Sequence, residues 1–186
     1  ADAFDALKKF HDEKKDWLFG YFTYDLKNEI EKLESLHPDR LHFPQLHFFQ
    51  PRYVFIKDGH GLQAGYLDEI DSDKSVLDLL HEIESEEIQY AESPELEVKP
   101  GVSRENYLHT VAEIKKHIQR GDIYEMNYCV GFSAQAELEH PENICEKLWE
   151  ISPMPFSCYY KTNELHLLCA SPERFISRQG KKIISR

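Results

Sequence analysis

Cysteine is scarce in this sequence, and its few copies lack the spacings that build zinc sites or redox centres. The four cysteines among 186 residues are Cys129, Cys145, Cys158 and Cys169; none forms a Cys-x-x-Cys pair, and most lie in apolar stretches. The ten histidines are scattered without metal-ligand spacing. We therefore expect no metal site within the chain, and we interpret the cysteines as reduced core thiols of a cytoplasmic protein.

Basic residues and long apolar runs are also in short supply. Lys and Arg total 22 against 34 Asp and Glu, which leaves a formal net charge of −12. This excess of negative charge repels phosphates, so it disfavours nucleic acids and anionic membranes as partners. No apolar run approaches the roughly 20 residues of a membrane-spanning helix, and the first residues lack the pattern of a signal peptide. A cytoplasmic protein that acts on a small molecule fits these absences.

The widespread catalytic motifs are missing too. The sequence contains no G-x-G-x-x-G, no P-loop, no H-E-x-x-H and no G-x-S-x-G. These general motifs therefore give no support to four classes of function: dinucleotide binding by a Rossmann loop, P-loop chemistry, zinc proteolysis and serine hydrolysis on an α/β-hydrolase fold. Any catalytic role must be argued from less general segments.

What the sequence does contain is a mixture of helical and strand-like periodicity. Helices are predicted at 3–14, 25–35, 75–85, 103–121 and from 141 onward. Strands are predicted at 17–24 (a buried one), on both sides of Asp58-Gly59, over 123–138, and in short runs from 156 to 186 with turns at Thr162-Asn163 and Gln179-Gly180. This mixed order favours the α+β class, with antiparallel sheets packed with helices.

Two helices carry clear local signals. Ser103 is a suitable N-cap, and Gly121 is suited to end the same helix because glycine accepts a positive φ. The helix that opens at His140-Pro141 places Ile144, Leu148 and Ile151 on one stripe, which we expect to face inward.

Acidic residues crowd positions 82 to 98, and the stretch ESPELEVKPG is typical of a solvated connector. We place a domain boundary there. The prediction is a first part over 1–98 and a second over 99–186.

Three segments are candidates for chemistry. On a strand, Glu125 and Asn127 would share one face, which either meets solvent or lines a pocket. Pro155-Phe156-Ser157 either forms a simple turn into a core strand or contributes to a site. In LCASPERFI, residues 168–176, Glu173 follows a strand end, so it belongs either to a surface turn with an ion pair or to a site.

Several segments, in this order, resemble the chorismate-utilising enzymes. They are WLFGYFTYDL (17–26), GDIYEMNYCVGF (121–132), PFSCYY (155–160) and ASPERFI (170–176). The resemblance implies the two-sheet αβ sandwich of chorismate-binding enzymes. This family includes component I of anthranilate synthase and of aminodeoxychorismate (para-aminobenzoate) synthase.

Within that family, Pro155-Phe156-Ser157 and the Arg-Phe after Glu173 resemble the aminodeoxychorismate branch. Glu125 stands where the water-adding branch has lysine, which disfavours addition of water, but it also departs from the glutamine that is usual in the ammonia-using branch. The resemblance thus implies amination of chorismate with ammonia to 4-amino-4-deoxychorismate, in the para-aminobenzoate and folate route. Two alternatives stay open: an anthranilate synthase component I of tryptophan biosynthesis, and a non-catalytic module that binds tryptophan or a glutaminase.

The resemblance also implies roles for individual residues. Glu173 matches an acidic active-site residue that acts as general acid and base or lies beside Mg²⁺. Pro155, Phe156 and Ser157 match residues that bind tryptophan, and Glu125 and Asn127 are possible pocket lining.

The resemblance further implies partners and a longer chain. A glutaminase subunit, component II, would supply the ammonia, and most Mg²⁺ ligands would lie outside this chain. In the family, a Pro-Ile-x-Gly-Thr stretch follows shortly after the position of Arg186. We therefore expect these residues to be part of a longer protein, to be inactive alone, and to expose apolar surface.

Overall fold

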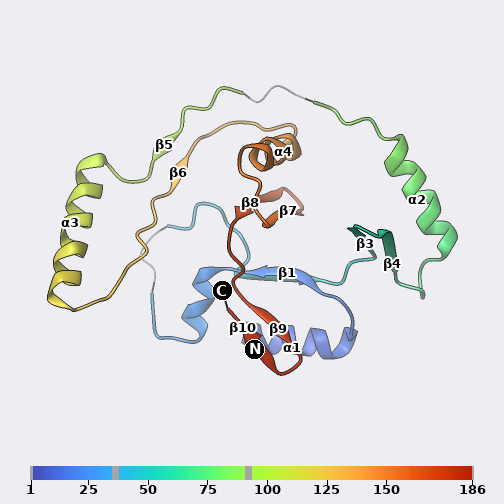
Figure 1. Ribbon diagram of the computed structural model, residues 1–186, viewed down its shortest axis with the longest axis horizontal. Coiled ribbons are helices and arrows are strands. Elements are labelled where there is room, and N and C mark those ends of the chain that lie inside the picture. Colours follow the sequence, from blue (N-terminus) through green and yellow to red (C-terminus); the bar gives the residue numbers. More distant parts are fainter. Residues whose placement is uncertain (1, 35–37, 91–93, 186) are drawn as a thin grey trace. The chain divides into compact units, whose positions relative to one another are not determined.

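The computed structural model describes residues 2–34, 38–90 and 94–185 and divides into two compact units, Ala1–Ile88 and Gln89–Arg186 (Figure 1). We call them the N-terminal and C-terminal units and describe each by itself. Part of the predicted acidic connector, residues 91–93, lies outside the described residues. The boundary predicted at 98/99 stays a prediction.

Within residues 2–34 and 38–88, the N-terminal unit contains two helices, two strand pairs and one short 3₁₀ helix. Its elements are α1 (Ala3–Lys14), β1 (Phe19–Phe22), η1 (Tyr24–Glu29), β2 (Leu46–Phe49), β3 (Tyr53–Asp58), β4 (Gly61–Tyr66) and α2 (Asp73–Ser85). Local signals explain the helix starts, because the Asp2 carboxylate accepts the Phe4 N–H at 2.8 Å and Ser72 forms a capping box. The predicted helices at 3–14 and 75–85 and the hairpin at 53–66 are confirmed.

The predicted helix over 25–35 is wrong. The chain instead forms the 3₁₀ helix η1, which ends at Glu29, and residue 35 lies outside the described residues. Leu26 is buried, but Ile30 is 68% exposed. A short helix depends on the packing of its apolar face, so a continuation past Glu29 that has no packing partner is not stabilised.

Aromatic side chains hold β1 and β2 together as an antiparallel pair. The rings of Phe22 and Phe48 contact each other across the two strands in a tilted arrangement, with ring centres 5.0 Å apart. The predicted strand over 17–24 is therefore present as β1, but most of it is exposed rather than buried, because β2 is its one strand partner among the described residues. Gly20 faces Phe48 in the register, and a Cβ there would overlap the carbonyl oxygen of His47.

Over its described residues, the C-terminal unit has two helices and three strand pairs. Its elements are β5 (Lys99–Pro100), α3 (Arg104–Arg120), β6 (Phe132–Ser133), α4 (Pro141–Ile151), β7 (Phe156–Thr162), β8 (Leu165–Ser171), β9 (Ser177–Gln179) and β10 (Lys182–Ile184). As predicted, Ser103 caps α3 by accepting the Asn106 N–H at 3.2 Å, and Gly121 ends it with φ of 79°. Asn163 and Gly180 take positive φ in the two predicted turns.

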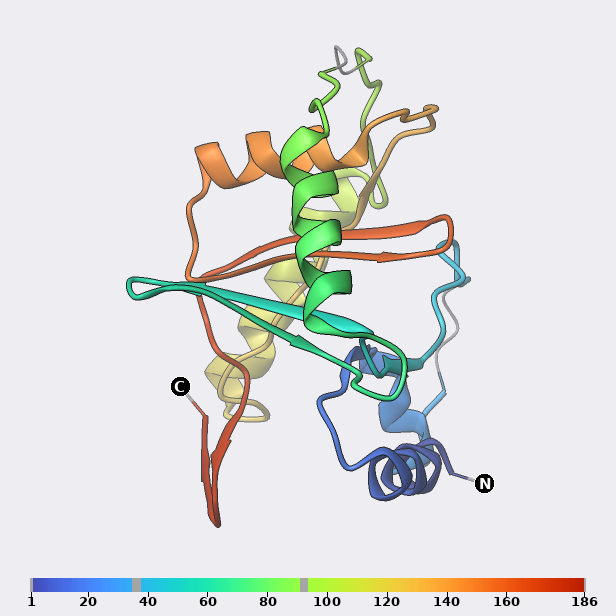
Figure 2. The same cartoon turned by 90° about the vertical axis from the view of Figure 1, so that its right-hand side faces the viewer.

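Helix α4 packs on the β7–β8 hairpin (Figures 1 and 2). The indole N–H of Trp149 donates to the carbonyl oxygen of Cys169 at 3.1 Å, which fixes the helix against β8. Ile144 and Leu148 are partly buried, but Ile151 at the helix end is 83% exposed, so the expectation that it faces inward is wrong.

The long strand predicted over 123–138 is wrong. Only β6 forms, and it pairs with β5; residues 122–131 are irregular. A strand is defined by hydrogen bonds to a neighbour, and no strand among the described residues lies beside this segment.

Every sheet of the described residues is an antiparallel pair, and helices accompany them, so the predicted α+β class is confirmed. The apolar core is small. Leu26, Val76 and Cys145 are its buried apolar members in the described part of the chain, whereas Phe132, Phe175 and Ile183 lie exposed. The described residues therefore do expose apolar surface, as expected.

The expectation of four core thiols is correct only for Cys145. Cys129 and Cys158 are exposed, and Cys169 is partly buried; all four are free. Cys129 lies on the unpaired segment 122–131, so no neighbouring strand covers it there.

Replacing Gly20 with alanine tests the close approach of β1 and β2. The new Cβ must push against the backbone of β2, so we expect Gly20→Ala to lower the free energy of unfolding by about 1–3 kcal/mol. Gly59→Ala is the matched control, since a Cβ at Gly59 meets nothing within 4 Å. Urea unfolding of both variants checks this; equal losses would contradict the clash.

Candidate functional site

A cavity opens at the end of the β7–β8 hairpin, and we call it the hairpin-end pocket. Its volume is about 450 Å³. It forms because β7 begins where β8 ends: Phe156 lies directly opposite Ser171 in the register, and the chain then continues through Pro172 toward β9. The lining residues are Phe156, Pro172, Glu173, Arg174, Ser177, Gln179 and Ile184.

The predicted Glu173 segment and the predicted Pro155–Ser157 segment meet in this pocket. The guanidinium carbon of Arg174 lies 4.9 Å from the ring centre of Phe156, which is a cation–π contact. Through this contact, the segment that contains Glu173 touches the segment that contains Phe156. The predicted turn at Thr162-Asn163 is consistent with the pairing of β7 and β8, but no local signal places Arg174, which lies beyond the end of β8, against Phe156.

Ser171 fixes the backbone at Glu173. Its hydroxyl accepts the Glu173 N–H at 3.3 Å and donates to the Glu173 carbonyl oxygen at 3.1 Å. The Glu173 side chain is exposed and lines the cavity. A carboxylate whose backbone is fixed and whose side chain faces an open cavity can exchange a proton with a molecule bound in that cavity.

The other predicted site residues lie apart from Glu173. Ser157 donates its hydroxyl to the Met154 carbonyl oxygen at 2.8 Å, and neither Ser157 nor the exposed Pro155 lines the hairpin-end pocket. Glu125 and Asn127 are exposed in the irregular segment 122–131, so the face they were predicted to share does not form. The roles of these residues stay predictions.

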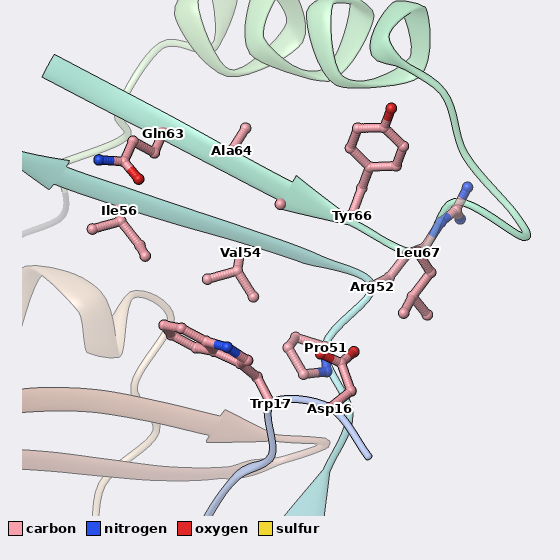
Figure 3. Close-up of a pocket in the computed structure, with 11 residues that line it drawn as sticks. Asp16, Trp17, Pro51, Arg52, Val54, Ile56, Gln63, Ala64, Tyr66 and Leu67 are labelled. Carbon is pink, nitrogen blue, oxygen red and sulfur yellow. The ribbon is translucent and has the colours of Figure 1, made fainter. Parts of the chain in front are cut away.

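The N-terminal unit has a second cavity, which the sequence did not reveal (Figure 3). Its volume is about 290 Å³. Trp17 faces Val54 and Ile56 of β3 across it (Figure 3). The sequence predicts the hairpin at 53–66 and the strand at 17–24, but it contains no signal that the two segments contact each other. The lining residues are Asp16, Trp17, Pro51, Arg52, Val54, Ile56, Gln63, Ala64, Gly65, Tyr66 and Leu67.

An ion pair fixes the rim of this second cavity. The Arg52 guanidinium donates two hydrogen bonds of 2.6 Å to the Asp71 carboxylate, and the Tyr53 hydroxyl donates a third. The Asp71 side chain is 1% exposed. The bonds from Arg52, and then the one from Tyr53, lower the pKa of Asp71 from 3.8 to about 2. The Arg52 guanidinium therefore neutralises the charge of Asp71 at the rim of this cavity.

Two features are absent from the part of the chain that the structure describes. Across the described residues, no group of three or more His, Cys, Asp or Glu side chains could hold a metal ion. None of the described helices is long and apolar enough to cross a membrane.

Comparison with known proteins identifies relatives over most of the chain. The family described as chorismate binding enzyme matches residues 1–186. Aminodeoxychorismate synthase component 1 of Bacillus subtilis is 26% identical over 180 residues, which cover 90% of this chain and 38% of that protein. Anthranilate synthase component 1 of Thermus thermophilus is 28% identical over 190 residues, 90% of this chain and 37% of that protein.

A solved structure shows the same fold. The crystal structure of anthranilate synthase component I from Streptococcus pneumoniae TIGR4 matches with a TM-score of 0.71 at 20% identity, over 89% of this chain and 40% of that one. The chain thus spans less than half the length of these relatives.

The Arg52–Asp71 pair predicts a specific pH dependence. Because the folded state lowers the pKa of Asp71, its contribution to stability is fully present above pH ~4 and is lost as the pH falls toward ~2. Asp71→Asn should lower the urea midpoint at neutral pH and remove this acid-dependent loss.

The control for that experiment is Asp78→Asn, which makes the same change of charge at an exposed position of α2. It should leave the acid-dependent loss in place. An Asp71→Asn curve that runs parallel to the unmodified protein between pH 4 and 2 would contradict the role of the ion pair.

Proposed function

This chain belongs to the chorismate binding enzyme family, and we propose that it is part of component I of an aminodeoxychorismate synthase. The family resemblance predicted from the sequence is confirmed. The finer proposal is supported by one observation above all: two segments whose residue types resemble the aminodeoxychorismate branch both reach the hairpin-end pocket, one through Phe156 and the other through Pro172, Glu173 and Arg174.

The proposed reaction replaces the C4 hydroxyl of chorismate with an amino group. Ammonia contributes the nitrogen, the hydroxyl leaves as water, and the product is 4-amino-4-deoxychorismate. Hydroxide is a poor leaving group, so the departing oxygen needs a proton in the transition state. We assign that proton transfer to the Glu173 carboxyl group, whose backbone is fixed by Ser171 and whose side chain lines the cavity.

The resemblance also supports a second ligand near the same hairpin. We propose that Pro155, Phe156 and Ser157 contribute to a tryptophan site in the whole protein. Phe156 offers an aromatic face, although Arg174 covers it in this structure. Tryptophan stacking on that ring would then compete with the Arg174 contact.

Mg²⁺ and the ammonia supply are the remaining parts of the proposal. One carboxylate, Glu173, lines the hairpin-end pocket, and the described residues bring no group of three or more His, Cys, Asp or Glu side chains together for a metal. That set does not make a Mg²⁺ site, so we derive no step through the ion. If Mg²⁺ takes part, most of its ligands come from residues outside this chain, and a glutaminase subunit supplies the ammonia.

An anthranilate synthase component I is the second candidate. It is favoured by the Thermus thermophilus relative, which at 28% identity is as similar to this chain as the aminodeoxychorismate synthase relative at 26%. In that case amination occurs at C2 and pyruvate is eliminated. A non-catalytic module that binds tryptophan or a glutaminase is the alternative outside enzymology.

Glu173→Gln tests the proposed proton transfer in the whole protein that contains this chain. The amide cannot give up a proton as a carboxylic acid does, so turnover of chorismate with ammonia should fall about 10²–10⁴-fold. The melting temperature should change little, because the side chain is exposed. Glu164→Gln, in the exposed turn between β7 and β8, is the control and should keep its activity. A large stability loss with normal specific activity would remove Glu173 from the mechanism.

Product analysis separates the candidate functions. The whole protein, supplied with chorismate, ammonium and Mg²⁺, should form 4-amino-4-deoxychorismate without pyruvate. Anthranilate with an equal amount of pyruvate would establish the second candidate instead. Tryptophan binding with no turnover at all would favour the non-catalytic module.

A further inference from the structure

Two of the free cysteines face each other across the β7–β8 hairpin. Cys158 of β7 and Cys169 of β8 are direct partners in the register. We propose that they form a redox-active dithiol, a modification site that closes to a cross-strand disulfide on contact with a small disulfide oxidant.

The hairpin geometry sets their separation. A two-residue turn, Asn163-Glu164, joins the strands, so Thr162 and Leu165 form the closing hydrogen-bonded pair. Along an antiparallel pair of strands, hydrogen-bonded and non-hydrogen-bonded residue pairs alternate. Cys158 and Cys169 lie four pairs beyond Thr162 and Leu165, so they are again a hydrogen-bonded pair. Such pairs have Cα atoms about 5.5 Å apart, which is within the usual Cα separation of ~4.4–6.8 Å for disulfides.

The two thiols also lie on the same face of the hairpin. Direct partners in an antiparallel pair place their side chains on one face of the sheet. Burial, and then the neighbouring Cys169 thiol, raise the pKa of the Cys158 thiol, so we expect the reaction to become faster as the pH rises toward that pKa and more thiolate is present. Trp149 holds the Cys169 carbonyl, so the backbone of β8 is fixed at this point.

Exposure decides which thiol reacts first. Cys158 is exposed and Cys169 is partly buried. With glutathione disulfide, the Cys158 thiolate attacks one sulfur, forms a mixed disulfide and releases one glutathione. Cys169 then attacks the Cys158 sulfur, closes the protein disulfide and releases the second glutathione. The protein loses two hydrogen atoms, and the oxidant becomes two thiols.

The position of the bridge gives it a consequence for the hairpin. Cys158 directly follows Ser157, and Cys169 lies two residues before Ser171, which fixes Glu173. A bridge would tie together the two strands that carry both candidate segments. Its formation does not depend on the proposed function, so it is measured as a covalent change without any activity assay.

The test treats the chain with glutathione disulfide, alkylates the remaining thiols and maps the peptides by mass spectrometry. We expect one major disulfide, between the peptides of Cys158 and Cys169, with Cys129 and Cys145 alkylated. Dithiothreitol should reverse it. Repeating the mapping on the whole protein should give the same bridge.

Serine variants identify the partners. Cys158→Ser and Cys169→Ser should each lose the bridge, while Cys129→Ser, which removes the other exposed thiol, should keep it. Three results would overturn the proposal. They are a bridge that involves Cys129 or Cys145, a stable mixed disulfide with glutathione as the main product, and alkylation of all four thiols after treatment with the oxidant.

Discussion

The antiparallel register of β7 and β8 is the constraint on which the candidate site depends. The turn at Asn163, with its positive φ, fixes this register from the tip of the hairpin. From there the pairing brings Phe156 opposite Ser171 and Cys158 opposite Cys169. A slip of one residue would turn every side chain of one strand to the other face. The Phe156–Arg174 contact and the thiol pair would then both disappear.

The elements themselves are fixed mainly by local interactions. Ser103 and Gly121 define the ends of α3. The Arg52–Asp71 pair is an exception, because it joins residues 19 positions apart at the rim of the second cavity. The apolar core of the described residues is small, and large aromatic side chains such as Phe132 and Phe175 lie exposed. Together with a length under half that of the relatives, this fits a region whose apolar faces pack on further residues of a longer protein.

The sequence was most informative where the signal is local. The cap at Ser103, the end at Gly121 and the hairpin turns could be predicted because each depends on a few neighbouring residues. The strand predicted over 123–138 failed because a strand needs a distant partner. The helix predicted over 25–35 does not continue past Glu29, where the Ile30 side chain is exposed. The meeting of Trp17 with β3, and of Arg174 with Phe156, depends on tertiary structure that no single segment encodes.

The most direct test of this account is the proton NMR spectrum of Arg174 and Phe156 in isotope-labelled protein. The structure places the Arg174 guanidinium over the Phe156 ring, so the Arg174 side-chain protons should be shifted upfield by the ring current. The register predicts cross-strand nuclear Overhauser effects between Phe156 and Ser171. Ordinary Arg174 shifts, with Phe156 opposite a residue other than Ser171, would contradict the register and with it the site built on Glu173.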